Sequence, residues 1–180
     1  MLQKLLTVLM VFSGIISLAQ SGNSTTANTA DYTAIGSPMP SFMAVTLDTL
    51  KRTPGKASTK VLKDKDVKNN ANLFVMIFNP ICEHCEDQTM MIEKNIGLFK
   101  QSNIVLICGK TFRQYLNNFL LITHNKEYPT IKIGVDSTDF IKKTLTYDLL
   151  PQLNIYNHDR KLIKTFSGAT PLDSFKQYIE

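Results

Sequence analysis

The chain has 180 residues, and 20 Lys and Arg against 15 Asp and Glu give a formal net charge of +5. The lysines are scattered, with no basic stripe and no nucleic-acid-binding motif, so we expect no nucleic-acid partner. The length suits one domain with a sizeable core, and three cysteines are too few for a small domain held together by disulfides.

The first residues are typical of an export signal. Lys4 precedes an apolar run over residues 5–18, and Ser17, Leu18 and Ala19 match the small-x-small pattern of signal-peptidase sites. We therefore expect a signal peptide over residues 1–19 and a periplasmic or cell-envelope location. The alternative is an uncleaved membrane anchor, although a membrane helix needs about 20 apolar residues.

The folded domain is expected over residues 38–180. Residues 20–37 begin with Ser, Gly, Asn, Thr and Ala and offer almost nothing to bury, so they are expected to form a disordered leader. A loose alternation over residues 41–47 predicts a short edge strand. The lysine-rich residues 51–70 are expected to form a loop with one helical turn.

Apolar runs and helical spacings then alternate along the chain. Continuous apolar runs indicate strands buried on both faces of a sheet, and apolar spacings of three and four indicate helices. The predicted elements are a strand over 73–78, a helix from 82 or 83 to 100, a strand over 103–108, a helix over 111–123, a strand over 131–135 and a helix over 137–145 capped by Ser137.

The last part of the chain predicts a hairpin and a closing helix. Two strands over 153–156 and 161–166 are joined by turn-forming residues 157–160. Pro171 is well placed to begin a final helix that ends at Tyr178 or Ile179. The order of all these elements predicts an α/β fold of three layers, a central mixed sheet flanked by helices.

The sequence Cys82-Glu83-His84-Cys85 lies where a buried strand gives way to a helix. The first turn of a helix exposes unpaired N–H groups and the positive end of the helix dipole, which favour a thiolate over a thiol. A thiolate is the species that attacks a disulfide. The spacing also allows the second sulfur to resolve a mixed disulfide. These residues therefore predict thiol–disulfide exchange.

Residues 78–85 resemble the active-site entry of the thioredoxin superfamily, and residues 147–156 with 159–168 are similar to its second landmark. In that family a cis-proline precedes a hairpin and faces the two cysteines. The layout resembles the exported TlpA/ResA-like redoxins, which have an N-terminal extension and an insert, here over 111–135. The resemblance covers residues 38–180 and implies a thioredoxin fold.

The resemblance also implies roles for individual residues. Cys82 is expected to be the exposed nucleophile and Cys85 the resolving thiol, while a cis Pro151 would place backbone groups where a substrate strand can pair. His84 would stabilise the Cys82 thiolate and make the protein more oxidising. Glu83 would oppose this, because a nearby negative charge disfavours the thiolate. The direction of exchange stays open.

This sequence departs from the family pattern in several places. Ile81 stands where a Trp precedes the first cysteine, and Met76 stands where thioredoxin has a buried acid. Glu86 and Asp87 are the remaining candidates for proton transfer to Cys85. Leu150 is bulkier than the usual Thr or Ser before the proline, which is expected to restrict which partners dock.

Several single residues allow another interpretation. Half of a zinc site is disfavoured because such sites need about four ligands, while there is no second CxxC and His124 and His158 are isolated. Cys108, within the apolar run, is expected to be an inert buried thiol. Pro129 also precedes a strand and is the rival candidate for a cis bond.

The expected partners are protein thiols or disulfides and a redox partner protein, with a monomeric chain and neither cofactor nor metal. One alternative function is a peroxiredoxin-like peroxidase, because residues 40–42 resemble a strand of that group, although Asn79 stands where peroxiredoxins have Thr. The other is a copper-binding module on the same fold. Its known relatives use CxxxC with a distal His, one residue longer than the spacing here.

Overall fold

The computed structural model describes residues 30–46, 60–67 and 70–180. The expected signal peptide and most of the expected leader lie outside these residues. No helix within them is long and apolar enough to cross a membrane. Contacts with the domain begin slightly before Pro38, because the Gly36 N–H donates to the carbonyl of Leu162 over 2.7 Å.

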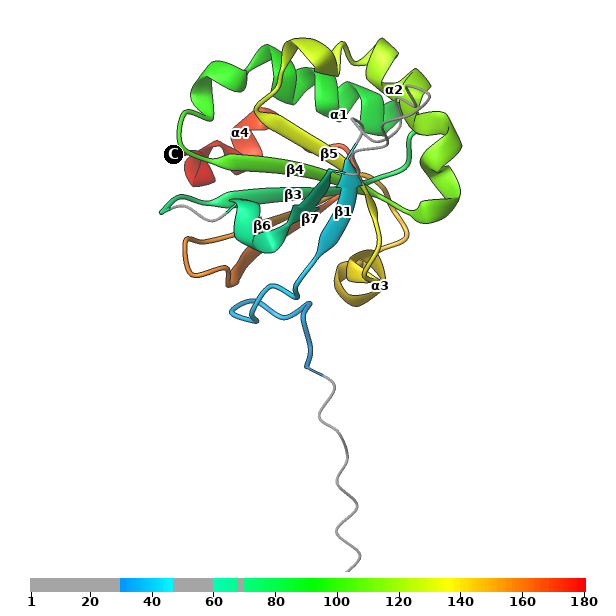
Figure 1. The fold of residues 1–180 in the computed structure, drawn as a ribbon. Coiled ribbons are helices and arrows are strands. Elements are labelled where there is room, and N and C mark those ends of the chain that lie inside the picture. Colours follow the sequence, from blue (N-terminus) through cyan, green and yellow to red (C-terminus); the bar gives the residue numbers. More distant parts are fainter. Residues whose placement is uncertain (1–29, 47–59, 68–69) are drawn as a thin grey trace, which may run out of the picture.

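A mixed sheet of seven strands forms the centre of the described part (Figure 1). Its spatial order is β2-β1-β5-β4-β3-β6-β7. The strands are β1 (Met43–Thr46), β2 (Val61–Lys63), β3 (Leu73–Phe78), β4 (Asn103–Cys108), β5 (Ile131–Asp136), β6 (Gln152–Tyr156) and β7 (Leu162–Ser167). The α-helices are α1 (Glu83–Lys94), α2 (Leu116–Ile122), α3 (Phe140–Thr144) and α4 (Leu172–Phe175).

Strand β3 lies inside the sheet between β4 and β6, and its six residues are all buried. It runs parallel to β4 and antiparallel to β6. The end of β3 therefore lies at the same edge as the beginning of β6, where Ile77 pairs with Gln152. This pairing brings the residues just after β3 close to the residues just before β6.

The two faces of the sheet carry separate clusters, as strand geometry requires. Phe74, Met76 and Phe78 of β3 face a core shared with α1, α2 and α4, whereas Leu73 and Val75 face a second core shared with α3. Figure 1 shows α1 and α2 on one side of the sheet and α3 on the other. The expected three-layer architecture is confirmed.

Two of the predicted helices are shorter than expected. Helix α1 ends at Lys94, because Asn95 leaves the helical conformation and a separate 3-10 turn follows over Ile96–Leu98, which contains Gly97. Gly disfavours a continued α-helix. The expected helix over 111–123 begins as a 3-10 helix over Lys110–Tyr115 and becomes α-helical only in α2.

The prediction that Ser137 caps α3 is wrong. Helix α3 begins at Phe140, and the carboxylate of Asp136 accepts hydrogen bonds from the N–H groups of Thr138 and Ile141 at 2.9 and 3.0 Å. The Ser137 hydroxyl instead donates to the carbonyl of Met43. The carboxylate of Asp136, at the end of β5, therefore accepts the hydrogen bonds expected of Ser137, and the Ser137 hydroxyl binds β1 instead.

Two smaller differences concern the segment before β3 and the last helix. Residues 61–63, expected in a loop, form the edge strand β2, and the expected helical turn follows as a 3-10 turn over Asp64–Val67. Pro171 precedes the last helix rather than starting it, and α4 continues as a 3-10 turn over Lys176–Tyr178. Three-residue strands give almost no periodic signal in a sequence.

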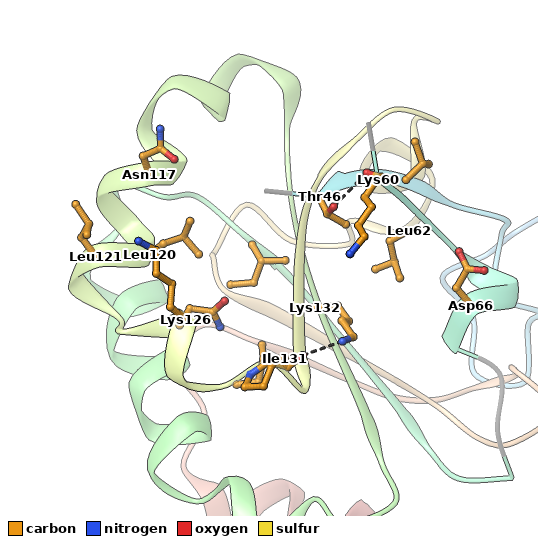
Figure 2. Close-up of a pocket in the computed structure, with 14 residues that line it drawn as sticks. Thr46, Lys60, Leu62, Asp66, Asn117, Leu120, Leu121, Lys126, Ile131 and Lys132 are labelled. Atoms are coloured by element: carbon orange, nitrogen blue, oxygen red, sulfur yellow. Dashed lines mark hydrogen bonds between the residues drawn. The ribbon is translucent and has the colours of Figure 1, made fainter. Parts of the chain in front are cut away.

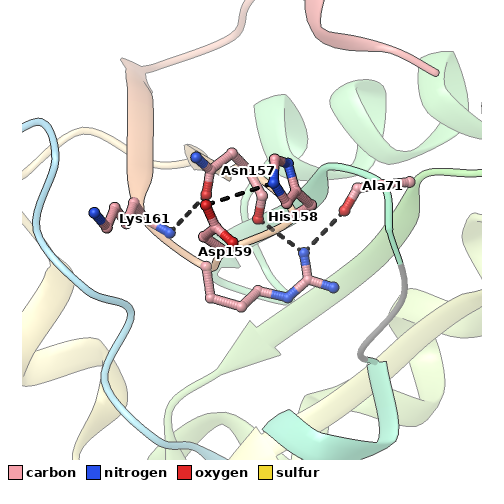
Figure 3. Close-up of polar contacts among 6 residues, drawn as sticks. Ala71, Asn157, His158, Asp159 and Lys161 are labelled. Atoms are coloured by element: carbon pink, nitrogen blue, oxygen red, sulfur yellow. Dashed lines mark hydrogen bonds and ion pairs between the residues drawn. The ribbon is translucent and has the colours of Figure 1, made fainter.

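The predicted turn between β6 and β7 is confirmed, and Arg160 anchors it (Figure 3). The Arg160 guanidinium is buried and donates to the carbonyls of Ala71, Asn157 and Val67 at 2.9, 3.0 and 2.6 Å. These bonds join the tip of the hairpin to the segment that enters β3. Strands β3 and β6 are therefore fixed to one another at the end opposite the cysteine motif and the proline.

Candidate active site

The passage from β3 into α1 is organised by Asn79. Its side-chain oxygen accepts the N–H of Ile81 and its carbonyl accepts the N–H of Cys82, both at 3.1 Å. Cys82 is the residue that caps α1, with extended backbone angles, and its carbonyl accepts the N–H of Cys85 at 2.9 Å. The chain thus turns into the helix at Cys82 itself. This places the first thiol at the helix N-terminus.

The two thiols of the motif differ in burial. Cys82 is half-buried, whereas Cys85 has 0% of its surface exposed, and both are free thiols in this structure. Burial raises the pKa of the Cys85 thiol far above its usual range, and the neighbouring Cys82 and the charge of Glu86 add to this rise. Cys85 is therefore held in its protonated form, behind an accessible partner.

The proline loop lies directly against the first thiol. The Leu150–Pro151 peptide bond is cis, as expected, and the bond before Pro129 is not. The Cys82 Sγ lies 3.9 Å from the carbonyl oxygen of Leu150, within reach of an S–H donor. The Pro151 carbonyl in turn accepts the N–H of Gly168 at 2.9 Å, which ties the loop to the end of β7.

This arrangement is similar to that of solved bacterial structures. One is the thioredoxin domain of a thiol-disulfide oxidoreductase from Bacteroides vulgatus, with a TM-score of 0.61 and 15% identity over 82% of this chain and 99% of that one. Another is a thiol:disulfide interchange protein from a Bacteroides species, with a TM-score of 0.59 and 14% identity over 82% and 91%. The chain has the thioredoxin fold.

A secreted disulfide oxidoreductase from Mycobacterium tuberculosis shares the thioredoxin fold with a TM-score of 0.55 and 12% identity, over 76% of this chain and 92% of that one. No family model matches the sequence, and no curated protein matches it. The resemblance drawn from the cysteine motif and the proline is thereby confirmed at the level of the fold. On this fold the two landmarks meet at one edge of the sheet.

Glu83 and His84 lie on the exposed surface of the first turn of α1. Neither side chain makes a hydrogen bond or an ion pair with any residue in the described part of the chain. The structure thus brings Cys82, Cys85 and Pro151 together. It leaves the two intervening side chains of the motif in solvent.

The departures from the family pattern have clear positions within the thioredoxin fold. Met76 is fully buried in the same core as Cys85. Of the two acidic candidates after the motif, Glu86 is half-buried and its charge acts on Cys85, whereas Asp87 is exposed. Ile81 is 59% exposed beside Cys82, where it offers an apolar contact at the rim of the site.

The third cysteine lies in the core, as expected. Cys108 ends β4, pairs in register with Phe78 and has no exposed surface. Burial raises its pKa to about 12. Among the described residues, no group of three or more His, Cys, Asp or Glu side chains is arranged to hold a metal ion.

A hollow of about 660 Å³ lies away from the cysteines, between α2 and the β1–β2 edge of the sheet (Figure 2). Its lining includes the buried residues Leu62, Leu120 and Ile133 and the exposed lysines Lys126 and Lys132. Cys82, Cys85 and Pro151 do not line it. The chemistry of the thiols therefore belongs to the edge of the sheet at the start of β6 and not to this hollow.

Sequence reasoning missed one residue of the site. Gln152 directly follows the cis-proline and is completely buried, and its carboxamide binds the loop that precedes the proline. The available signal was two amide side chains, Gln152 and Asn154, that alternate with apolar residues in a buried strand. Buried amides need hydrogen-bond partners, but the sequence does not say which residues supply them.

Proposed function

We propose that the protein is a thiol–disulfide oxidoreductase that acts on protein substrates through Cys82 and Cys85. The observation that carries this proposal is a half-buried thiol at a helix N-terminus, which faces a cis-proline loop and has a fully buried thiol beside it. Solved structures with the same fold include proteins described as thiol-disulfide oxidoreductases and as a thiol:disulfide interchange protein.

The reaction follows from the difference between the two thiols. In its deprotonated form Cys82 attacks one sulfur of a substrate disulfide, which forms a mixed disulfide and releases the other substrate sulfur as a thiolate. Cys85 then loses its proton and attacks Cys82. This step forms the Cys82–Cys85 disulfide, and the second substrate thiolate leaves. Two electrons pass to the substrate, whose two sulfurs take up the protons.

The high pKa of Cys85 supports its role as the resolving thiol. A protonated Cys85 does not compete with Cys82 for the incoming disulfide. Glu86 is the proposed proton acceptor for Cys85, because it is the half-buried carboxylate whose charge already acts on that thiol. The carbonyl of Leu150 and the groups around Pro151 are the proposed docking points for an extended substrate backbone.

The direction of exchange depends on Glu83 and His84, which favour opposite forms of Cys82. In the reducing direction a redox partner protein would return the Cys82–Cys85 disulfide to the dithiol. We place the protein in the periplasm or cell envelope, as a monomer. An export signal read from the first residues supports this location, and so does the secreted oxidoreductase that shares the fold.

The decisive experiment is the reduction potential of the Cys82–Cys85 couple in glutathione or dithiothreitol buffers. A value near that of thioredoxin, about −270 mV, indicates a reductase, and one near that of DsbA, about −120 mV, indicates a disulfide donor. Insulin reduction with dithiothreitol provides the activity assay. Failure of the couple to form a disulfide at any potential would contradict the proposed function.

A further inference from the structure

The loop over residues 145–150, which together with Pro151 joins α3 to β6, has two features that matter for a protein substrate. Its last residue, Leu150, presents the carbonyl that faces Cys82 Sγ. Its middle exposes large apolar side chains, with Tyr147 53% and Leu149 66% exposed. The loop contains no regular secondary structure, so something outside its own backbone must fix its shape.

Gln152 supplies this support through all the hydrogen-bonding capacity of its carboxamide. Its Nε2 donates to the carbonyl of Thr144 at 2.7 Å and to Oδ1 of Asn154 at 2.9 Å. Its Oε1 accepts from the N–H of Thr146 at 2.8 Å and from the Thr146 hydroxyl at 3.0 Å. An amide has two donors and two lone pairs, so each of them has a partner here.

The geometry of these bonds amounts to a clamp. Thr144 and Thr146 stand at the beginning of the loop, and Gln152 stands just after its end, so the side chain draws the two ends together. The bond to Asn154 fixes the orientation of the amide, and Asn154 is held in turn by the hydroxyl of Thr165 on β7 at 3.1 Å. The loop is therefore anchored to the sheet through one buried side chain.

We propose that Gln152 is a positioning residue that sets how the 145–150 loop is presented to protein substrates. It keeps the Leu150 carbonyl beside Cys82 and holds Tyr147 and Leu149 at the rim, where they contact the polypeptide around the substrate cysteine. This inference rests on the proposed function. A small disulfide reaches Cys82 without touching the rim, so the clamp matters for a polypeptide and not for a small molecule.

The test compares two substrates in three proteins. Gln152→Leu keeps the approximate shape of the side chain and removes all four bonds. Thr165→Val is the matched control, because it removes a bond from the same network without touching the loop. For each protein, kcat and KM are measured with insulin and with glutathione disulfide, at a temperature well below unfolding.

We expect Gln152→Leu to raise KM for insulin about tenfold, since displacements of about 1 Å in positioning groups have effects of this size or larger. The kcat/KM for glutathione disulfide should stay within about twofold of the wild-type value. This change is smaller than the roughly tenfold or greater loss that follows removal of one methylene contact. Thr165→Val should change neither parameter. Hydrogen exchange at the Thr146 amide should accelerate in Gln152→Leu, because its acceptor has been removed.

Equal losses with both substrates, or unchanged kinetics with insulin, would overturn the positioning role. If Gln152→Leu does not fold, Thr146→Val replaces it, because Thr146 is exposed and its hydroxyl contributes one of the four bonds. A smaller rise in KM restricted to insulin is then expected, and its absence counts against the proposal. A wild-type protein that reduces neither substrate would instead contradict the proposed function, so the two failures are distinct.

Discussion

Helix α1 carries a buried ionisable group near each of its ends, and the two have different surroundings. Cys85 lies in the first turn and is fully buried, while Glu93 lies in the last turn and is 3% exposed. Burial raises both pKa values, that of Cys85 beyond its usual range and that of Glu93 to about 7. A strongly shifted pKa is therefore not by itself the mark of an active site in this protein.

The neighbours of the two groups make the difference. Cys85 has a second thiol beside it, which is half-buried and stands at the helix N-terminus. Glu93 has the side-chain amide of Asn125, which donates to it at 3.4 Å, and the nearby charge of Glu127. One end of the helix holds two groups that can react with one another, and the other end holds a carboxyl that joins the helix to a loop.

The largest effect is expected from changing the cysteines at the N-terminal end. Cys82→Ser should abolish insulin reduction, because no thiolate remains to attack the substrate. Cys85→Ser should also stop turnover but should leave a mixed disulfide trapped on Cys82. Mass spectrometry after incubation with a disulfide substrate detects that adduct. An adduct on Cys85 in the Cys82→Ser protein would reverse the two roles.

The C-terminal end predicts an effect on stability rather than on activity. Between pH of about 4.5 and about 7 the folded state holds a proton on Glu93 that the unfolded state has lost, so the free energy of unfolding should fall as pH rises through this window. The expected contribution is on the order of 2 kcal/mol after allowance for screening. Urea unfolding at several pH values measures it.

Glu93→Gln removes the titration and keeps an oxygen that can accept from Asn125. The variant should lose this part of the pH dependence while its exchange activity stays unchanged. If its activity changed as much as its stability, the distinction between the two ends of the helix would not hold.

Smaller effects are expected from the two exposed residues of the motif. His84→Gln should lower the reduction potential, because a cation or donor that favours the Cys82 thiolate is removed, and Glu83→Gln should raise it. Both side chains are in solvent, so shifts of about 30 mV or less, at most tenfold in the equilibrium constant, are expected. Redox titration measures them, and two shifts of the same sign would contradict the electrostatic account.

Little effect on activity is expected at Cys108, a buried ionisable group away from either end of α1. Its pKa of about 12 keeps the thiol protonated. The residue has no exposed surface, so a substrate cannot reach its sulfur. Cys108→Ala should leave insulin reduction within about twofold of wild type, since only protonated, buried sulfur is lost. It should lower the free energy of unfolding by about 1 kcal/mol through loss of packing. A large loss of activity would mean that this thiol takes part in exchange.

Much of this arrangement can be predicted from the sequence. The apolar runs of β3 and β4 locate the central strands, because strands buried on both faces are continuously apolar. The spacing of Cys82 and Cys85 and the strands after Pro151 indicate the reactive edge. Each of these signals lies within a few consecutive residues.

The parts that could not be predicted depend on contacts between distant segments. Gln152 binds Thr144 at the end of α3 and Thr146 in the loop after it, and the partner of Glu93, Asn125, begins the 3-10 turn after α2. Neither environment leaves a periodic trace in the sequence. The end of α1 at Lys94 and the strand β2 were missed for a related reason, since short elements are decided by their neighbours in space.

The antiparallel run of β6 beside β3 also determines when the site comes into existence. Cys82 and the carbonyl of Leu150 are 68 residues apart in the chain and meet only when β6 has joined the sheet. During synthesis the dithiol is made well before the loop that faces it. A nascent chain that ends before β6 therefore carries the dithiol without the Leu150 carbonyl that faces Cys82, and this contact arises only when β6 joins the sheet. Thiol labelling of such chains would report on completion of the fold.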